Sequence, residues 1–198
     1  MREFIYYSSS APTSGNFVGQ DLQKSGRLDI AIHSVIATFF LSHELREDVT
    51  LHLLFDGSPN PPRHLELKPD IHDEGKVYIN KSNIADIIKK MLYKYKEGEK
   101  KEVFPGYWIE RKSLLTLIKD MQKEGKTIFV LDKSGERLRD AEIPENSVFL
   151  LGDHHGLPAL KKEFKRIAPR KVSIGKRTYF ASQTLAVLNN ELDIREDN

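Results

Sequence analysis

Hydrophobic and polar positions alternate along this chain with two different periods, and each period predicts a different element. Short runs rich in β-branched and aromatic residues predict strands. These runs fall at residues 3–7, 49–55, 64–68, 76–79, 104–110, 127–131, 147–151 and 170–174. An Asp-Gly turn signal begins at Asp56, between the second and third runs, and predicts that those two strands pair antiparallel.

Apolar residues three and four positions apart predict amphipathic helices between the strands. One helix follows Ser25, one is capped by Asn80 or Ser82, and one ends before Gly125. Their buried faces are predicted to carry Ile32, Val35, Ile36, Phe39 and Phe40 in the first, Ile84, Ile87, Ile88, Met91 and Leu92 in the second, and Leu114, Leu115, Leu117, Ile118 and Met121 in the third. Strands that alternate with helices predict an α/β fold with a mostly parallel sheet flanked by helices.

The last fifty residues contain two glycine loops, and each follows a predicted strand. Gly152 and Gly156 lie in the first loop and Gly175 lies in the second. Loops at the carboxyl ends of neighbouring strands are the usual ligand site in an open α/β sheet, and glycine lets the backbone approach a ligand closely. The alternative is two tight turns capped by glycine, because lone glycine loops are weak signals.

Composition excludes several classes of protein and of site. The chain has 198 residues, 39% hydrophobic and 30% charged, which is enough for one domain with a sizeable core. No apolar run could span a bilayer and the first residues lack a signal peptide's apolar core, so we expect a cytoplasmic protein with no membrane partner. The absence of cysteine excludes disulfides and cysteine-based zinc sites. With a net charge of +2, any nucleic-acid contact must come from local basic patches.

The start of the first predicted helix carries a candidate anion site. Arg27 and Asp29 fall in the first turn, where free backbone N–H groups favour an anion. Arg27 either holds a phosphate or pairs with Asp29, and the alternative is a solvated helix cap. A mixed charge run at 94–102 is a second basic candidate, although its interspersed glutamates favour a solvated helix end and loop.

Two other kinds of chemistry have weaker support. His154 and His155 suggest a metal or a general base, but adjacent side chains point in different directions and no third ligand lies at a usual spacing. We therefore predict no metal site. A nucleotide hydrolase is not supported either, because the chain lacks a glycine-rich Gly-Lys-Ser/Thr phosphate motif.

Several motifs share one order along the chain. Gly-Arg-Leu-Asp-Ile at 26–30 and Phe-Phe-Leu-Ser-His-Glu-Leu-Arg-Glu-Asp-Val at 39–49 come first. Val-Phe-Leu-Leu-Gly-Asp-His-His-Gly-Leu at 148–157, Val-Ser-Ile-Gly at 172–175 and a helix that closes in Asn-Asn-Glu-Leu-Asp at 189–193 follow. Together they resemble the SPOUT class of RNA methyltransferases, and within it the archaeal tRNA pseudouridine-54 N1-methyltransferases. The resemblance covers nearly the whole chain.

The resemblance implies one SPOUT domain over residues 1–198, with a C-terminal trefoil knot and S-adenosylmethionine-binding part at about 126–198. It implies S-adenosylmethionine as methyl donor, no metal, a homodimer, and tRNA rather than DNA as partner. The expected reaction is N1-methylation of pseudouridine at position 54 of tRNA. Two alternatives stay open: a ribosomal RNA pseudouridine N1-methyltransferase, and a non-catalytic RNA-binding or assembly protein of the same fold.

The resemblance also places the donor on three loops, through Leu131, Gly152, Ile174, Gly175, Lys176, Arg177, Thr178, Tyr179 and Thr184. This chain departs from the family pattern in the third loop. Lys176 stands where a proline is common, and Thr184 stands where a cysteine is usual. Phe-Ala-Ser-Gln at 180–183 replaces a frequent His-Ala-Asp-His. Backbone contacts are expected to survive these changes, and no role is assigned to the side chains at 180, 182 and 183.

Related ribosomal enzymes carry an Arg-x-Asp sequence in their RNA pocket, so the resemblance assigns that role to Arg27 and Asp29. Asp29 is the candidate catalytic residue, because a carboxylate can orient the acceptor base or take its N1 proton. Phosphate contacts are expected from Arg27, Arg46, Arg63, Lys176 and Arg177, although Arg63 also fits a solvated strand end. The last helix, with Leu185, Leu188 and Leu192, is either a dimer face or a core stripe.

Overall fold

The computed structural model describes residues 2–69, 79–158, 167 and 169–196. Its strands are β1 (Arg2–Ser8), β2 (Val49–Phe55), β3 (Arg63–Leu67), β4 (Lys101–Phe104), β5 (Tyr107–Glu110), β6 (Thr127–Arg137), β7 (Ser147–Gly152) and β8 (Arg170–Ser173). In this part of the chain they form one sheet in the order β4-β5-β3-β2-β1-β7-β6-β8. Its helices are η1 (Gly15–Phe17), α1 (Leu28–Phe39), α2 (Ile84–Lys94), α3 (Leu114–Lys123) and α5 (Ala181–Glu196).

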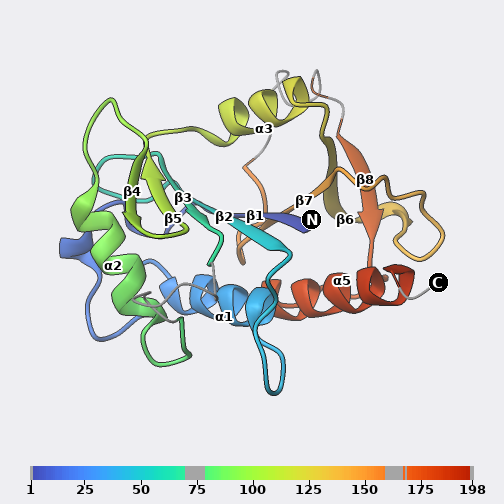
Figure 1. Cartoon of the computed structure of the whole chain (residues 1–198), viewed down its shortest axis with the longest axis horizontal. Helices are drawn as coiled ribbons and strands as arrows, with labels where there is room; N and C mark the ends of the chain where they lie inside the picture. The colour runs from blue at the N-terminus through green and yellow to red at the C-terminus, as the bar shows by residue number, and fades with distance from the viewer. Residues whose placement is uncertain (1, 70–78, 159–166, 168, 197–198) are drawn as a thin grey trace.

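Helices cover both faces of the sheet. In Figure 1, α1, α2 and α5 lie along one face and α3 lies on the other. Alternate β1 residues accordingly enter two cores: Phe4 and Tyr6 pack in the larger core with α1, α2 and α5, whereas Ile5 and Tyr7 pack with α3. Among the described residues, no helix combines the length and apolar character needed to cross a membrane.

The central and C-terminal strands are parallel. β1 pairs in parallel with β2 and β7, and β6 does so with β7 and β8. The other three pairings, which join β2, β3, β5 and β4, are antiparallel. The predicted α/β fold with a mostly parallel sheet is therefore confirmed. The predicted antiparallel pairing of β2 and β3 is confirmed too, although a longer connection at 56–62 joins them.

The predicted helical faces agree closely with burial. Every residue predicted for the second helix is buried in α2. In α3, Leu115 is only half-buried, whereas the other four predicted positions are buried. The α2 cap was misplaced, because the helix begins after Asn83, while Asn80 accepts hydrogen bonds from the N–H groups of Ser82 and Asn83.

The last helix uses its leucines inside the chain. Leu185 and Leu188 are fully buried and Leu192 is 9% exposed, all within the larger core. Asn189 on the same helix donates hydrogen bonds to the carbonyls of Ala37 and Thr38 at the end of α1. These leucines therefore form a core stripe, and the prediction that they make a dimer face is wrong.

Two local predictions were wrong. β6 does not end at residue 131, where the predicted strand ends, but continues to Arg137, because Gly135 lets the strand pass close to β8. A Cβ there would lie 2.6 Å from the Lys171 carbonyl carbon. Trp108 in β5 is half-buried, with Lys100 over its ring. β4 begins at Lys101, inside the charge run that predicted a loop. Apart from Ile79, the predicted strand at 76–79 lies outside the described residues.

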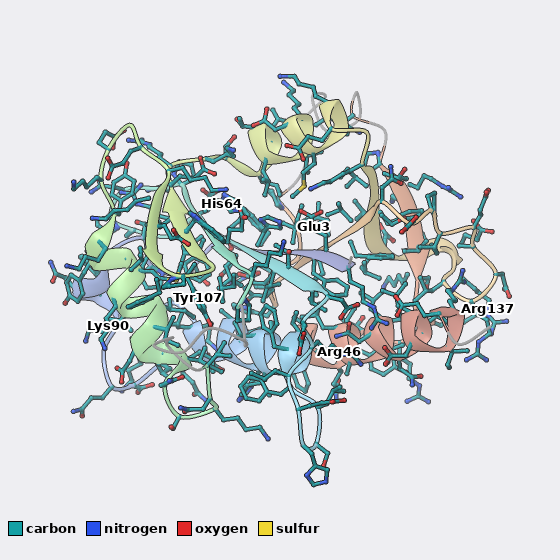
Figure 2. All side chains as sticks on the ribbon, viewed as in Figure 1. Glu3, Arg46, His64, Lys90, Tyr107 and Arg137 are labelled. Atoms are coloured by element: carbon teal, nitrogen blue, oxygen red, sulfur yellow. The ribbon has the colours of Figure 1, made fainter. Side chains whose placement is uncertain are left out.

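A line of buried ionisable side chains crosses the α3 face of the sheet. His52 on β2 contacts Glu3 on β1 at 2.8 Å, and His64 on β3 contacts Glu110 on β5 at 3.0 Å. The two imidazoles contact each other at 2.8 Å. Lys126 and Lys112 close the ends by pairing with Glu3 and Glu110 respectively. Figure 2 shows Glu3 and His64 in the middle of the molecule, on the side toward α3. We call this line of residues the histidine network.

The proton count in the histidine network follows from its contacts. Two imidazoles make three contacts, and each contact needs one proton. Burial lowers the pKa of His64 to about 4, so near pH 7 this ring is neutral and donates from Nδ1 to Glu110. The Nε2 of His64 is then free to accept from the Nδ1 of His52, at 2.8 Å. Burial alone would raise the pKa of Glu3 and of Glu110, but hydrogen bonds from the histidines and lysines lower both to about 2.

A cluster of ion pairs joins the two ends of the chain. Arg2 pairs with Glu196 at 2.7 Å, and Arg2 and Arg46 both contact Asp193. The Arg46 guanidinium makes two hydrogen bonds to the Asp193 carboxylate, at 2.7 and 2.6 Å. Figure 2 places Arg46 where α1 and α5 meet. The cluster fixes the C-terminal turn of α5 against the first strand.

Candidate active site

A large cleft opens at the carboxyl ends of the C-terminal strands. Its volume is about 1030 Å³, and it is lined by the middle of β6, the loops after β7 and β8 and the start of α5. Eight of the nine predicted donor-binding residues line it: Leu131, Gly152, Ile174, Gly175, Arg177, Thr178, Tyr179 and Thr184. Lys176 is exposed and does not line it. The two glycine loops do not follow neighbouring strands, because β6 lies between β7 and β8, yet both loops reach the cleft.

The first glycine loop is folded tightly on itself. A Cβ on Gly152 would lie 2.3 Å from the carbonyl carbon of Gly156, so only glycine fits without moving the backbone. Gly156 has φ of +76°, in the left-handed region that other residues rarely adopt. At Gly152 and Gly156, which both line the cleft, no side chain covers the backbone.

Asp153, which the sequence reasoning missed, holds this loop in place. It is 8% exposed. One carboxylate oxygen accepts hydrogen bonds from the Ser8 hydroxyl at 2.7 Å and from the Ser9 N–H at 3.1 Å, and the other accepts from the His155 N–H at 2.8 Å. Two sequence features could have indicated this role of Asp153. It follows the glycine that ends a predicted strand, and a serine-rich loop follows the first predicted strand.

The third loop is held by its own polar side chains. Ser173 donates to the Gly175 carbonyl and accepts from the Gly175 N–H. Gln183 accepts from the Phe180 N–H at 3.1 Å, and Thr184 donates its hydroxyl proton to the Phe180 carbonyl at 3.1 Å. Gln183 and Thr184 therefore shape the start of α5, which begins at Ala181. Tyr179 and Phe180 are 42% and 74% exposed on the cleft wall.

Asp132, a carboxylate on the cleft wall, was also not predicted from the sequence. Asp132 accepts a hydrogen bond from Lys171 at 2.8 Å and another from the Ser134 N–H at 2.8 Å. The hydrogen bond from Lys171, helped by those from Ser134, holds the pKa of Asp132 well below its usual range. Asp132 is therefore an anion at neutral pH, on the same wall as Leu131.

The two adjacent histidines lie on the cleft wall and are exposed. The rings of His154 and His155 lie 3.8 Å apart, centroid to centroid. Among the described residues, the one group of three side chains with ligand spacing is elsewhere, at His52, His64 and Glu66. Two of its members already hydrogen-bond each other within the histidine network.

Arg27 and Asp29 meet at the start of α1, beside the cleft. Gly26 and Arg27 both have left-handed backbones, with φ of 62° and 58°. This kink turns the Arg27 guanidinium onto Asp29, with two hydrogen bonds of 3.0 Å. That interaction lowers the pKa of Asp29, so the carboxylate is ionised near neutral pH. Ile30, the next residue, lines the cleft. The alternative of a solvated cap is wrong, because Arg27 pairs with Asp29.

The other predicted phosphate ligands differ in accessibility. Arg46 has 11% of its side chain exposed and pairs with Asp193. Arg63 is 4% exposed, lies over the Tyr95 ring and donates to the carbonyls of Asn60 and Pro62. The expectation of a solvated strand end at Arg63 is wrong. Protein partners thus occupy Arg46 and Arg63, whereas Lys176 and Arg177 are exposed.

Fold and cleft together point to a class of enzyme. A family described as "Putative SAM-dependent RNA methyltransferase" matches residues 1–196. The chain therefore belongs to this methyltransferase family. The crystal structure of Archaeoglobus fulgidus Nep1 bound to S-adenosylhomocysteine shares the fold, with a TM-score of 0.61 and 12% identity, covering 100% of this chain and 99% of that one.

Two curated relatives are similar over nearly their whole length. One is the tRNA (pseudouridine(54)-N(1))-methyltransferase of Thermococcus kodakarensis, 35% identical over 206 residues, covering 98% of this chain and 99% of the relative. The other, from Vibrio parahaemolyticus, is named "Putative pseudouridine methyltransferase"; it is 33% identical over 202 residues, covering 99% of this chain and 100% of the relative. The two names share the modified nucleoside, but only the first gives its position in tRNA.

Proposed function

We propose that this protein methylates N1 of pseudouridine at position 54 of tRNA, with S-adenosylmethionine as the methyl donor. One observation carries the proposal. The Arg27–Asp29 pair lies beside the cleft, and this cleft is lined by eight of the nine residues expected to bind the donor. Family membership and the names of the relatives support the same reaction.

The cleft fits S-adenosylmethionine in size and chemistry. Ligand pockets usually measure about 300–1000 Å³, and a cleft of about 1030 Å³ leaves room for an acceptor base beside the donor. Backbone groups near Gly152 and Gly175 suit the edge of adenine. The donor supplies an activated methyl group, and the protein's task is to align an acceptor nitrogen with it, which can provide much of the rate acceleration.

Asp29 is proposed to orient the acceptor. Because Arg27 lowers its pKa, the carboxylate is ionised at neutral pH and can accept a hydrogen bond from the base. The same shift makes it a weaker proton acceptor, since a general base works best with a pKa near the working pH. We therefore assign Asp29 mainly to holding the pseudouridine ring, and Arg27 to fixing that carboxylate. Lys176 and Arg177 are the exposed cations proposed to contact phosphates.

The larger assembly is also proposed. Residues 1–198 are taken as a single SPOUT domain, with a trefoil knot and donor-binding part at about 126–198. A cytoplasmic homodimer fits the family resemblance. Its interface cannot use the leucine stripe of α5, which is buried within one chain, so the exposed side chains of that helix, Val187 and Ile194, are better candidates.

The proposal is tested by methyl transfer from labelled S-adenosylmethionine. The substrate is tRNA with pseudouridine at position 54, and matched controls carry uridine there or pseudouridine in a ribosomal RNA. Label confined to the first RNA is the expected result. Label only in ribosomal RNA would favour the ribosomal alternative. An absence of donor binding by calorimetry would favour a non-catalytic RNA-binding protein.

Two variants test the roles within the site. Asp29→Asn keeps the shape of the side chain and removes its charge, so the base is held less well and methyl transfer should fall about 100-fold while donor affinity stays unchanged. Arg27→Ala should weaken RNA binding as well as transfer. If both variants methylated tRNA like the parent, the acceptor pocket would have to lie elsewhere in the cleft.

A further inference from the structure

A second cavity lies next to the proposed acceptor pocket. Its volume is about 320 Å³. Its walls come from the loop after β1, the segment before α1 and the turn after β2. The residues that matter for its chemistry are Ser9, Phe17, Lys24, Gly26 and Ser58. None of them is among the residues expected to bind the donor or the acceptor.

The two cavities share a wall. Ser9, which lines the second cavity, donates its backbone N–H to Asp153, which lines the donor cleft, at 3.1 Å. Gly26 lines the second cavity and Ile30 lines the cleft, and the two residues are only four positions apart in the chain. The Arg27–Asp29 pair lies between these two residues. A nucleic acid with one base at Asp29 therefore has its neighbouring nucleotide within reach of the second cavity.

Phe17 presents an aromatic ring from a well-fixed segment. The residue is 54% exposed, yet the next residue, Val18, is 4% exposed and packs in the core. Backbone hydrogen bonds from Phe17 to Ser14 and from Val18 to Gly15 close the 3-10 helix. Gly15 itself lies under the Tyr93 ring, since a Cβ there would be 2.7 Å from ring atoms. The backbone that carries this exposed ring is thus fixed beside the cavity, which favours a stacking surface.

Polar groups around the ring suit a ribonucleotide. The hydroxyls of Ser9 and Ser58 make no hydrogen bond among the described residues, so they can bind ribose or base atoms. The Lys24 side chain is 87% exposed, and its one ion pair, to Asp21, spans 3.4 Å. Exposed pairs of this kind are weak, so a phosphate can replace Asp21. An aromatic face, free hydroxyls and a cation are the groups that bind unpaired RNA.

We propose that this cavity is a nucleotide subsite, which holds the RNA nucleotide adjacent to the methylated one. Its base stacks on Phe17 and its phosphate pairs with Lys24. The inference rests on the proposed function, because an RNA acceptor held at Asp29 provides the neighbouring nucleotide. The subsite would favour substrates whose target lies in an unpaired loop, where the adjacent base is free to stack.

The test measures RNA affinity in Phe17→Ala, Phe17→Trp and Lys24→Gln, with Leu41→Ala as control. Leu41 is also an exposed apolar residue, at 40%, but it follows the opposite end of α1. The probe is pseudouridine-54 tRNA, titrated by fluorescence anisotropy with S-adenosylhomocysteine present and over a range of salt. Loss of one stacked base weakens binding about 5- to 150-fold, which is the expectation for Phe17→Ala. Phe17→Trp should bind like the parent.

Lys24→Gln should reduce the slope of log affinity against log salt by about 0.7, the loss of one single-strand phosphate contact. Equal affinity of Phe17→Ala and the parent overturns the stacking role, and an unchanged slope overturns the phosphate contact. The proposed function is judged separately, from methyl transfer by the parent. If the parent methylates only another RNA, and Phe17→Ala binds that RNA weakly, the subsite stands and the assigned substrate fails.

Discussion

The donor cleft and the histidine network use polar groups in opposite ways. In the cleft, glycine loops expose backbone groups, and side chains such as Arg177 and Phe180 face solvent. In the network, His52 and His64 are 3% and 1% exposed, and each of their ring nitrogens has a partner. Free polar groups can bind a ligand, whereas satisfied buried groups can only hold strands together.

This contrast shows which titratable residues bear on function. The most strongly perturbed histidine, His64, lies in the network on the α3 face of the sheet. Perturbed pKa values often mark active sites, but structural ion-pair networks perturb them too. Here a perturbed residue of a binding site can be told from a structural one by whether it lines a cavity. Asp132 lines the cleft, whereas His64 lines neither cavity.

The largest expected effect comes from adding a side chain at Gly152, where the backbone of Gly156 lies close to it. Gly152→Ala places a Cβ against the Gly156 backbone, so the loop must move. Displacement of about 1 Å in a binding site can cost about 100-fold, and we expect donor affinity to fall by at least that much in calorimetry. Gly19→Ala is the matched control, because its added carbon would approach only the Ser25 hydroxyl, at 3.5 Å. Equal affinity in both variants would contradict the tight-loop account.

Breaking the histidine network should affect stability rather than binding. His52→Ala removes one partner from each of Glu3 and His64, while Glu3 keeps Lys126 and His64 keeps Glu110. The variant leaves a cavity and an unsatisfied buried ring nitrogen on His64, which together typically cost about 2–5 kcal/mol, so the free energy of unfolding in urea should fall by about this amount. Donor affinity of the folded protein should stay within about twofold of the parent. A large loss of donor affinity would show that the network and the cleft are coupled.

Acid should weaken the same network. The pKa values of Glu3 and Glu110 are lowered to about 2, so their stabilising contribution is present above the usual carboxyl range and is lost as pH falls toward 2. The pKa of His64 is lowered from 6.5 to about 4, so the unfolded chain binds a proton first and stability also falls between these values. Unfolding free energy should therefore decrease steadily on acidification from pH 7.

Glu110→Gln sharpens this test. The amide oxygen can still accept from His64, but it does not titrate, so the decline in stability below about pH 4.5 should be shallower than in the parent. Urea unfolding at several pH values measures both curves. Parallel curves would mean that Glu110 contributes little to the acid sensitivity.

The smallest effect is expected at the border of the network. Lys100 pairs with Glu66 at 2.6 Å, but 43% of the lysine side chain is exposed. Pairs of this kind contribute about 0.2–1 kcal/mol, so Lys100→Ala should shift the urea midpoint only slightly. A shift as large as that of His52→Ala would mean that the network extends to the surface.

Hydrophobic periodicity was sufficient to predict much of the fold. The buried face of α2 and the antiparallel pairing of β2 with β3 follow from local pattern. The position of Leu131, Gly152 and Thr184 on one cleft came from motif order and family resemblance. Their clustering could not come from periodicity, because it depends on how β6, β7 and β8 are ordered in the sheet.

The errors arise from contacts that local residue patterns do not show. Arg46 and Arg63 looked like free cations because their partners are distant or structural: Asp193 lies 147 positions away, and the carbonyls of Asn60 and Pro62 have no side-chain signal. The histidine network was missed for a similar reason. Its members lie on four strands, and only the sheet register brings Glu3, His52 and Glu110 into one line.

The ion pair between Arg2 and Glu196 also has a consequence for biosynthesis. The two residues are 194 positions apart, so at about 5–20 residues per second a ribosome makes the second roughly 10–40 s after the first. β7, one of the two neighbours of the central strand β1, is made late in that interval, and the partners of Arg2 on α5 are made only at its end. A strand that is made early is therefore among the last to be secured, and a nascent chain stalled before α5 would leave Arg2 without Asp193 and Glu196.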